Sequence, residues 1–195
     1  MERADNYSLL LLAGGKSSRM GANKAELLYE GRTFLENLIE KAKGLGIRKI
    51  YLSGYQGECE EAQIVYDIYS GIGPLGGLHA GLKAIQTPYC LVLPVDIPQI
   101  PQEFLEVLIE AHEQGIRNQE NETKPMLVER DGFLEPLIGI YPVKMSAFME
   151  EKILAERFSV FRMLKEWGCE NYQTDIPEEL IANINTREDY EKLLK

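Results

Sequence analysis

Apolar runs alternate with helically spaced apolar residues along the first half of the chain. The runs predict strands buried within a sheet, and we expect four of them, at 7–15, 48–54, 62–67 and 89–96. Apolar residues three and four positions apart predict the helices that follow strands, at 33–43, after Pro74 and around 104–109. Such alternation is typical of βαβ units, in which helices connect parallel strands. The first half therefore predicts an α/β fold.

The second half has a less regular pattern. Apolar stretches at 124–130 and 135–143 flank the pair Asp131-Gly132, which predicts two antiparallel strands joined by a turn. The remaining expected elements are helices at 145–156, at 159–168 and after a capping box formed by Thr186 and Asp189. No repeat, low-complexity tract or linker interrupts the pattern, so we expect a single domain over residues 1–195.

Composition and charge narrow the class of function. A chain of 195 residues can bury a substantial core, and its net charge of −10 argues against a protein that coats nucleic acid. No apolar stretch has the length of a membrane span or of a secretory signal, so we expect a cytoplasmic protein. Cys59, Cys90 and Cys169 are scattered, and only two histidines accompany them, which argues for reduced thiols and against structural zinc.

The stretch "LLAGGKSSRMGANKAE" (11–26) follows the first predicted strand and combines three glycines with Lys16, Arg19 and Lys24. Glycine backbone N–H groups can turn toward an anion, and the cationic side chains favour a phosphate. The stretch has neither the Walker spacing nor the GxGxxG spacing. A plain turn between a strand and a helix remains an alternative, but it needs neither this length nor three cations. We therefore expect a cradle for phosphates.

Asp96 directly follows the apolar run 89–95 and precedes two prolines. A carboxylate at the carboxyl end of a parallel strand, near a phosphate loop, is a typical ligand for Mg²⁺. Helix capping is the alternative reading, since Asp is a common N-cap residue. The next helix is expected to begin near Pro101, too far along the chain for that role. We therefore expect Asp96 to hold Mg²⁺.

Two further stretches carry weaker signals. The glycines of 66–81 allow close approach of the backbone, and the helix after Pro74 presents its positive end to the same edge of the sheet. Tight packing of a glycine-faced helix explains the same glycines, and His79 is expected to be a packing or surface residue. In "NINT" (183–186), Thr186 can cap the last helix, while the two asparagines can contact a polar ligand.

Four motifs together resemble the molybdenum cofactor guanylyltransferase family, within the wider MobA-like nucleotidyltransferases. "LLAGGKSSRMGANKA" is similar to that family's LAGGxSxRMGxDK loop, and "GPLGGLHAGL" to its GPLxGI segment. "LPVDIPQIP" is similar to its P-C-D-x-P segment, and "NINTREDY" to its N-x-N-T-P-E-D-L segment. The resemblance covers nearly the whole chain. It implies a single-domain, three-layer α/β/α Rossmann-like fold with a mainly parallel sheet and an antiparallel addition from the second half.

The same resemblance implies a role for individual residues. Residues of the nucleotide-binding half (1–100) would bind GTP through backbone and side chains, namely Leu12, Ala13, Gly14, Gly15, Lys24, Ser53, Asp67 and Asp96. Ser53 and Asp67 would contact the base and ribose, Asp96 would hold Mg²⁺, and Arg19 with Lys24 would stabilise charge on the phosphates. In the acceptor half (101–195), Asn183 and Asn185 would contact the pterin. The chain departs from the family pattern at Asn23, Ser53, Val95 and Arg187.

The implied reaction transfers GMP from GTP to the terminal phosphate of molybdopterin and releases pyrophosphate. A phosphate nucleophile is already an anion, so the reaction depends on positioning and charge neutralisation rather than on a general base. A sister enzyme that transfers CMP to molybdopterin, or a nucleotide to a sugar or alcohol phosphate, stays open. A non-catalytic GTP-binding sensor or cofactor chaperone is the alternative from another class. Expected partners are transient ones, which supply molybdopterin or mature molybdoenzymes.

Overall fold

The computed structural model describes residues 2–14, 23–118 and 124–195. Its centre is a seven-stranded sheet in the order β5-β4-β1-β6-β8-β7-β9. The strands of the sheet are β1 (Tyr7–Leu12), β4 (Lys49–Ser53), β5 (Gln63–Val65), β6 (Tyr89–Pro94), β7 (Met126–Arg130), β8 (Phe133–Pro142) and β9 (Glu170–Gln173). A separate hairpin joins β2 (Leu28–Tyr29) to β3 (Arg32–Thr33).

Strand direction divides the sheet into two parts. β5, β4, β1 and β6 run parallel, as the alternation of strands and helices predicted. β8 lies between β6 and β7 and runs antiparallel to both, and β9 pairs in parallel with β7. The expected antiparallel addition from the second half is thereby confirmed, with the turn at Asp131-Gly132.

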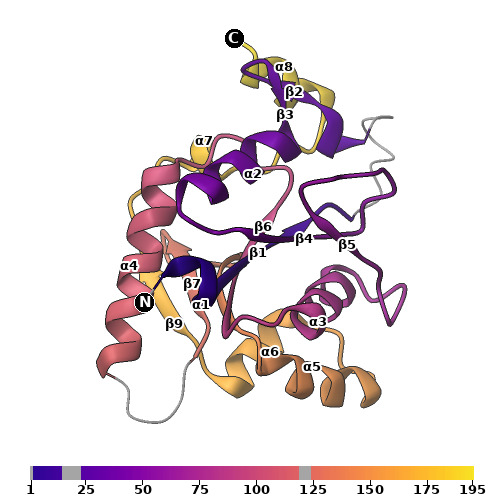
Figure 1. Ribbon diagram of the computed structural model, residues 1–195, viewed down its shortest axis with the longest axis vertical. Coiled ribbons are helices and arrows are strands. Elements are labelled where there is room, and N and C mark those ends of the chain that lie inside the picture. Colours follow the sequence, from indigo (N-terminus) through magenta and orange to yellow (C-terminus); the bar gives the residue numbers. More distant parts are fainter. Residues whose placement is uncertain (1, 15–22, 119–123) are drawn as a thin grey trace.

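Helices cover both faces of the sheet (Figure 1). α2 and α4 lie on one face, and α3, α5 and α6 lie on the other. Alternate side chains of β1 point to opposite faces, so Leu9 and Leu11 join one buried cluster while Leu10 and Leu12 join the second. This arrangement confirms the three-layer α/β/α fold of a single domain.

Local sequence explains where the helices begin. Thr33 and Glu36 form a capping box at the start of α2, and Thr186 forms the expected capping box with Asp189 at the start of α8. Pro74 occupies the first turn of α3. The helices are α1 (Arg3–Asn6), η2 (Lys24–Glu26), α2 (Phe34–Gly44), α3 (Pro74–Ala84), α4 (Gln102–Asn118), α5 (Met145–Leu154), α6 (Val160–Trp167), α7 (Glu178–Ile181) and α8 (Arg187–Leu193).

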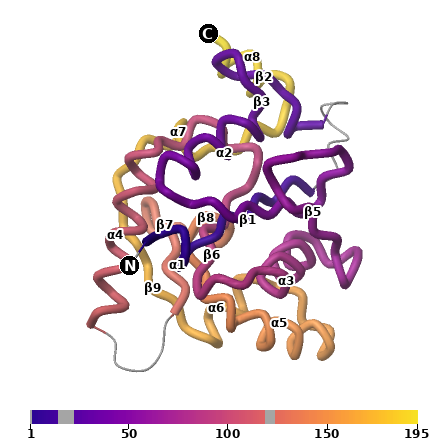
Figure 2. The backbone as a smooth tube through the Cα atoms, in the orientation of Figure 1, coloured from indigo at the N-terminus to yellow at the C-terminus, as the bar shows by residue number. Residues whose placement is uncertain are grey.

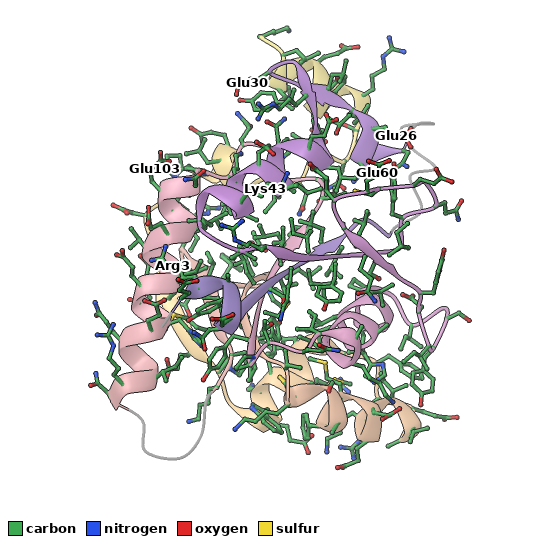
Figure 3. All side chains as sticks on the ribbon, viewed as in Figure 1. Arg3, Glu26, Glu30, Lys43, Glu60 and Glu103 are labelled. Atoms are coloured by element: carbon green, nitrogen blue, oxygen red, sulfur yellow. The ribbon has the colours of Figure 1, made fainter. Side chains whose placement is uncertain are left out.

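Side-chain contacts hold each end of the chain against another segment. Arg3 in α1 pairs with Glu106 on α4 at 3.2 Å, and Figure 3 shows Arg3 beside α4. Figure 2 shows α8 beside the β2–β3 hairpin, where the Tyr190 hydroxyl donates to the Leu28 carbonyl at 2.8 Å. These contacts place the end of the chain close to the segment that follows the glycine loop. No helix in the described ranges is long and apolar enough to cross a membrane.

Candidate active site

A cleft of about 790 Å³ lies at the carboxyl ends of the parallel strands. In open α/β sheets this edge is the usual place for a ligand. Residues from both halves of the chain line the cleft: Leu12, Ala13, Gly14, Lys24, Ser53, Gly54, Asp67, Gly71, Gly73, Pro74, Gly77, Pro94, Val95, Asp96, Leu137, Asn183 and Asn185. The residues expected to bind nucleotide, metal and acceptor therefore surround one space, as far as the structure describes them. Gly15 and Arg19 lie outside the described residues.

The backbone that enters the glycine loop is held between two strands. The Ala13 N–H donates to the Ser53 carbonyl at 2.8 Å, which continues the pairing of β1 with β4. On the other side, the Val95 N–H donates to the Leu12 carbonyl at 3.0 Å. Leu12, Ala13 and Gly14 thus leave the sheet with a fixed backbone path, and they form the floor of the cleft between β4 and β6.

Lys24 links the loop to the other side of the cleft. Its Nζ donates to Asp96 Oδ2 at 2.7 Å and to Asn185 Oδ1 at 2.6 Å. The side chains of Lys24 and Asp96 are each only 16% exposed. Asn23 supports this position as the N-cap of η2, because its Oδ1 accepts from the Ala25 N–H. Either Asn or Asp can fill such a cap, so the departure at Asn23 preserves the local geometry.

The backbone of Asp96 anchors the segment with the two asparagines. The Ile184 N–H donates to the Asp96 carbonyl at 2.8 Å, and the Ile184 side chain is buried. Asn183 and Asn185 flank Ile184 and line the cleft instead. α4 begins at Gln102, six positions after Asp96, so Asp96 does not cap it. The structure thus excludes the capping alternative for Asp96 and brings both asparagines to its side.

Ser53 and Asp67 face the glycine-rich surface of α3. The Ser53 hydroxyl donates to Asp67 Oδ1 at 3.4 Å. A Cβ added at Gly77 would lie 2.6 Å from Ser53 Oγ, and one at Gly76 would lie 2.8 Å from Asp67 Oδ2. A bare helix surface is therefore required for both side chains to reach this part of the cleft. The roles expected for Ser53 and Asp67 at the base and ribose stay predictions.

The ligands available for a metal ion can be tested against these contacts. No group of three or more His, Cys, Asp or Glu side chains gathers within the described residues. Of the described carboxylates that line the cleft, Asp96 pairs with Lys24, whereas Asp67 accepts a hydrogen bond from Ser53. Mg²⁺ is commonly held by one or two carboxylates together with substrate phosphates. The residues present fit a Mg²⁺ ion that arrives with a nucleotide, and they do not form a closed protein cage.

Leu137 is a cleft residue that the sequence analysis did not single out. It lies on β8, inside the predicted strand 135–143, and it belongs to no motif. The available signal was Pro136, since a proline within an inner strand indicates a local break in pairing. His79, in contrast, is fully buried on α3 beside the Tyr69 ring, at 5.5 Å between ring centroids. It is a packing residue, as expected.

Comparison with known proteins identifies the family. Residues 9–167 match the family model of the MobA-like NTP transferase domain. A Clostridium perfringens protein named "Probable molybdenum cofactor guanylyltransferase" is 32% identical over 204 aligned positions, which cover 96% of each chain. A protein of the same name from Aquifex aeolicus is 30% identical, with 94% of this chain and 88% of that protein covered.

Solved structures show the same fold. Molybdopterin-guanine dinucleotide biosynthesis protein A from Archaeoglobus fulgidus superposes with a TM-score of 0.75 at 23% identity, over 95% of this chain and 96% of that one. CMP:2-keto-3-deoxy-manno-octonic acid synthetase, solved with CTP, superposes with a TM-score of 0.73 at 11% identity, over 96% of each chain. The family match and the full-length relatives support one assignment. The chain belongs to the MobA-like NTP transferase family and is a nucleotidyltransferase.

Proposed function

We propose that this enzyme transfers GMP from GTP to the terminal phosphate of molybdopterin and releases pyrophosphate. The observation that carries the proposal is the meeting of Lys24, Asp96 and Asn185 in one cleft. Asp96 follows β6, and in the sheet β1 and β4 lie on one side of β6, where we propose that the nucleotide binds, while β8 lies on the other side, where we propose that the acceptor binds. The relatives named molybdenum cofactor guanylyltransferase support the choice of guanylyl transfer.

The nucleotide side provides binding and orientation. The backbone of residues 12–14 and the positive end of the eleven-residue helix α3 lie where they can contact a triphosphate. Ser53 is the last residue of β4 and Asp67 follows β5, and in this proposal both side chains would contact the nucleoside. Among the described residues that line the cleft, Lys24 carries a positive charge. It would stabilise the negative charge that develops on the pyrophosphate leaving group.

Asp96 lies between the two substrates in this proposal. Mg²⁺ bound at Asp96 would neutralise phosphate charge and let two polyanions approach each other. Asn183 and Asn185 would hold the acceptor on the other side of Asp96. Since the acceptor phosphate is an anion at neutral pH, none of these residues needs to remove a proton from it.

The decisive test measures transfer directly. Purified protein is incubated with molybdopterin, Mg²⁺ and GTP, CTP or UTP, and both pyrophosphate and the dinucleotide product are quantified. We expect the rate of product formation with GTP to be at least tenfold higher than with CTP or UTP. One contact that is specific for the base changes the free energy of the transition state by about 1–3 kcal/mol. Preferred turnover of CTP or UTP, or transfer to a sugar or alcohol phosphate instead, would replace the proposal with a sister activity.

GTP binding without pyrophosphate release would overturn the proposal in favour of a sensor or chaperone. Calorimetry of GTP binding in the same buffer separates that outcome from a protein that fails to bind any nucleotide. Contacts with proteins that supply molybdopterin or mature molybdoenzymes, and a cytoplasmic location, stay predictions from the sequence.

A further inference from the structure

A three-residue bulge in β8 opens toward the cleft. Leu127 on β7 pairs with Gly139 on β8, but the next residue, Val128, pairs with Glu135. One step along β7 therefore corresponds to four steps along β8, which leaves residues 136–138 as extra length on β8. β-Bulges of this kind often lie beside active sites, where they redirect a side chain.

The bulge lies beside the end of β6. The pairing of β6 with β8 reaches Val92 and Gly139, and it continues no further toward the cleft in the described sheet. Beyond that point Pro94, Val95 and Leu137 all line the cleft, next to Asp96. Ile138 is buried in the core, whereas Leu137 is half-buried. At the bulge the adjacent residues Ile138 and Leu137 therefore differ in environment, since Ile138 is in the core and Leu137 lines the cleft.

Two contacts hold the bulge in place. The hydroxyl of Tyr141 donates to the Pro136 carbonyl, five residues back along the same strand. Tyr141 is fully buried, and burial raises its pKa, so the hydroxyl stays a neutral donor. At Gly139, an added Cβ would lie 2.4 Å from the Met126 carbonyl oxygen, so the strands can approach here only with glycine. The bulge is therefore a defined feature of the hairpin.

We propose that Leu137 binds the acceptor substrate as an apolar wall against one face of its pterin ring system, an inference that rests on the proposed function. In the strand order β8 lies on the opposite side of β6 from β1 and β4. Leu137 is thus separated from Ser53, on β4, by β1 and by β6, the strand that ends two residues before Asp96. Asn183 and Asn185 also line the cleft, and their polar groups can bind the edge of the ring. Apolar walls with a few polar groups are typical of small-molecule sites.

Core packing is the competing explanation, because Leu137 also contacts the buried cluster beneath β8. Leu134 offers a matched control. It is a leucine of the same strand, it is also half-buried, and it packs against the same cluster, but it does not line the cleft. A role in packing alone predicts the same phenotype for both leucines.

The experiment compares Leu137→Ala, Leu137→Met and Leu134→Ala in steady-state kinetics, with thermal unfolding as a measure of stability. We expect Leu137→Ala to raise the KM for molybdopterin about tenfold and to leave the KM for GTP unchanged. The reason is that the shorter side chain loses its apolar contacts with the pterin ring. Leu137→Met, which keeps the volume, is expected to restore the acceptor KM to within about threefold of wild type. Leu134→Ala is expected to lower Tm without changing either KM.

Two results would overturn this inference while the wild type remains active: an unchanged acceptor KM in Leu137→Ala, or an equal rise in Leu134→Ala. If Leu137→Ala does not fold, Leu137→Val replaces it, with an expected rise of about threefold. Failure of the proposed function itself has a different signature, since the wild-type protein would then release no pyrophosphate from GTP and molybdopterin.

Discussion

The two sides of the cleft are built in different ways. The side proposed to bind the nucleotide consists mainly of backbone and glycine surface at the ends of β1 and β4 and at the start of α3. The side proposed to bind the acceptor consists of side chains, namely Leu137 in the bulge with Asn183 and Asn185, and Asp96 lies where the two sides meet. A triphosphate is common to all NTPs and can be bound by backbone N–H groups, whereas an individual acceptor needs side chains of matching shape.

The two sides also differ in how they are held. Ladder pairing on both flanks of β1 continues into residues 12 and 13. Separate hydrogen bonds rather than a ladder hold the proposed acceptor side, among them those from Ile184 to Asp96, from Tyr141 to Pro136 and from Lys24 to Asn185. Segments with few backbone hydrogen bonds open locally at lower free energy than ladder strands. We therefore expect the acceptor side to be the more adaptable one, and four measurements test the division.

The largest expected effect is at Asp96, where the two sides meet. Asp96→Asn keeps the shape of the side chain and removes its charge, so a Mg²⁺ ligand and a charge partner of Lys24 are lost together. We expect kcat to fall about 10³-fold, comparable to the loss of a central electrostatic contact. Steady-state pyrophosphate release checks this, and Asp131→Asn in the β7–β8 turn is the matched control. Activity within tenfold of wild type would exclude Asp96 as the metal ligand.

The start of β1, at the end of the strand far from the cleft, is expected to make the free energy of unfolding depend on pH. It should not affect substrate binding on either side of the cleft. Tyr7, the first residue of β1, shares a hydrogen bond of 2.9 Å with His112 Nδ1, and burial lowers the pKa of His112 from 6.5 to about 4. Between these values the unfolded chain binds more protons than the folded protein, so stability falls as pH falls. We expect a loss of about 2 kcal/mol between pH 7 and pH 5 from this residue.

Urea unfolding at both pH values measures this loss, with His112→Phe as the comparison. The pH dependence should shrink in the variant, although burial also lowers the pKa of His79 and leaves a smaller contribution in the same direction. An equal slope in both proteins would contradict the assignment to His112.

The glycine surface of α3 is expected to matter for the nucleotide alone. Gly77→Ala places a methyl group 2.6 Å from Ser53 Oγ and displaces that side chain. We expect the KM for GTP to rise about tenfold while the acceptor KM stays constant, because a shift of this kind costs about 1–3 kcal/mol. Gly115→Ala in α4, away from the cleft, controls for the change in helix propensity. An equal rise in the KM values for GTP and for the acceptor would contradict the proposal that the two substrates bind to separate sides of the cleft.

The smallest expected effect concerns Lys24, whose ammonium donates to both Asp96 and Asn185. In the nucleotide-free protein Asp96 competes with a triphosphate for the Lys24 ammonium. With EDTA present, Asp96→Asn should therefore tighten GTP binding about fivefold, a coupling near 1 kcal/mol. Calorimetry checks this in a double-mutant cycle, since the gain should vanish in the Lys24→Met background. A gain that persists there reflects only reduced repulsion between Asp96 and the phosphates.

Much of the nucleotide side could be predicted from the sequence because its signals are local. The apolar run before Gly14, the cations after it and the carboxylate at position 96 each follow from neighbouring residues. The family resemblance supplied Ser53 and Asp67 as candidates for base and ribose, and it assigned Asn183 and Asn185, already noted as possible ligand contacts, to the pterin. In the structure all of these line one cleft, while their individual contacts with substrates stay predictions.

The acceptor side shows where sequence patterns are insufficient. The contact of Lys24 with Asn185 joins residues 161 positions apart, and no local pattern encodes it. The position of Leu137 depends on how β7 aligns with β8, and that register follows from packing across the whole hairpin. The short strand β9 and the single-turn helix α7 also escaped prediction, because four residues are too few to show a clear period.

The antiparallel direction of β8 bears on how such enzymes diverge. The bulge enters the cleft from a hairpin, so an insertion or deletion within 136–138 would leave the register of β1, β4 and β6 unchanged. With the proposed role of Leu137, mutations in this one short stretch would alter the preferred acceptor while the geometry of the nucleotide side persists. We expect lineages with this architecture to exchange acceptors more readily than nucleotide chemistry, and the hairpin is the natural segment to randomise when a new acceptor is sought in the laboratory.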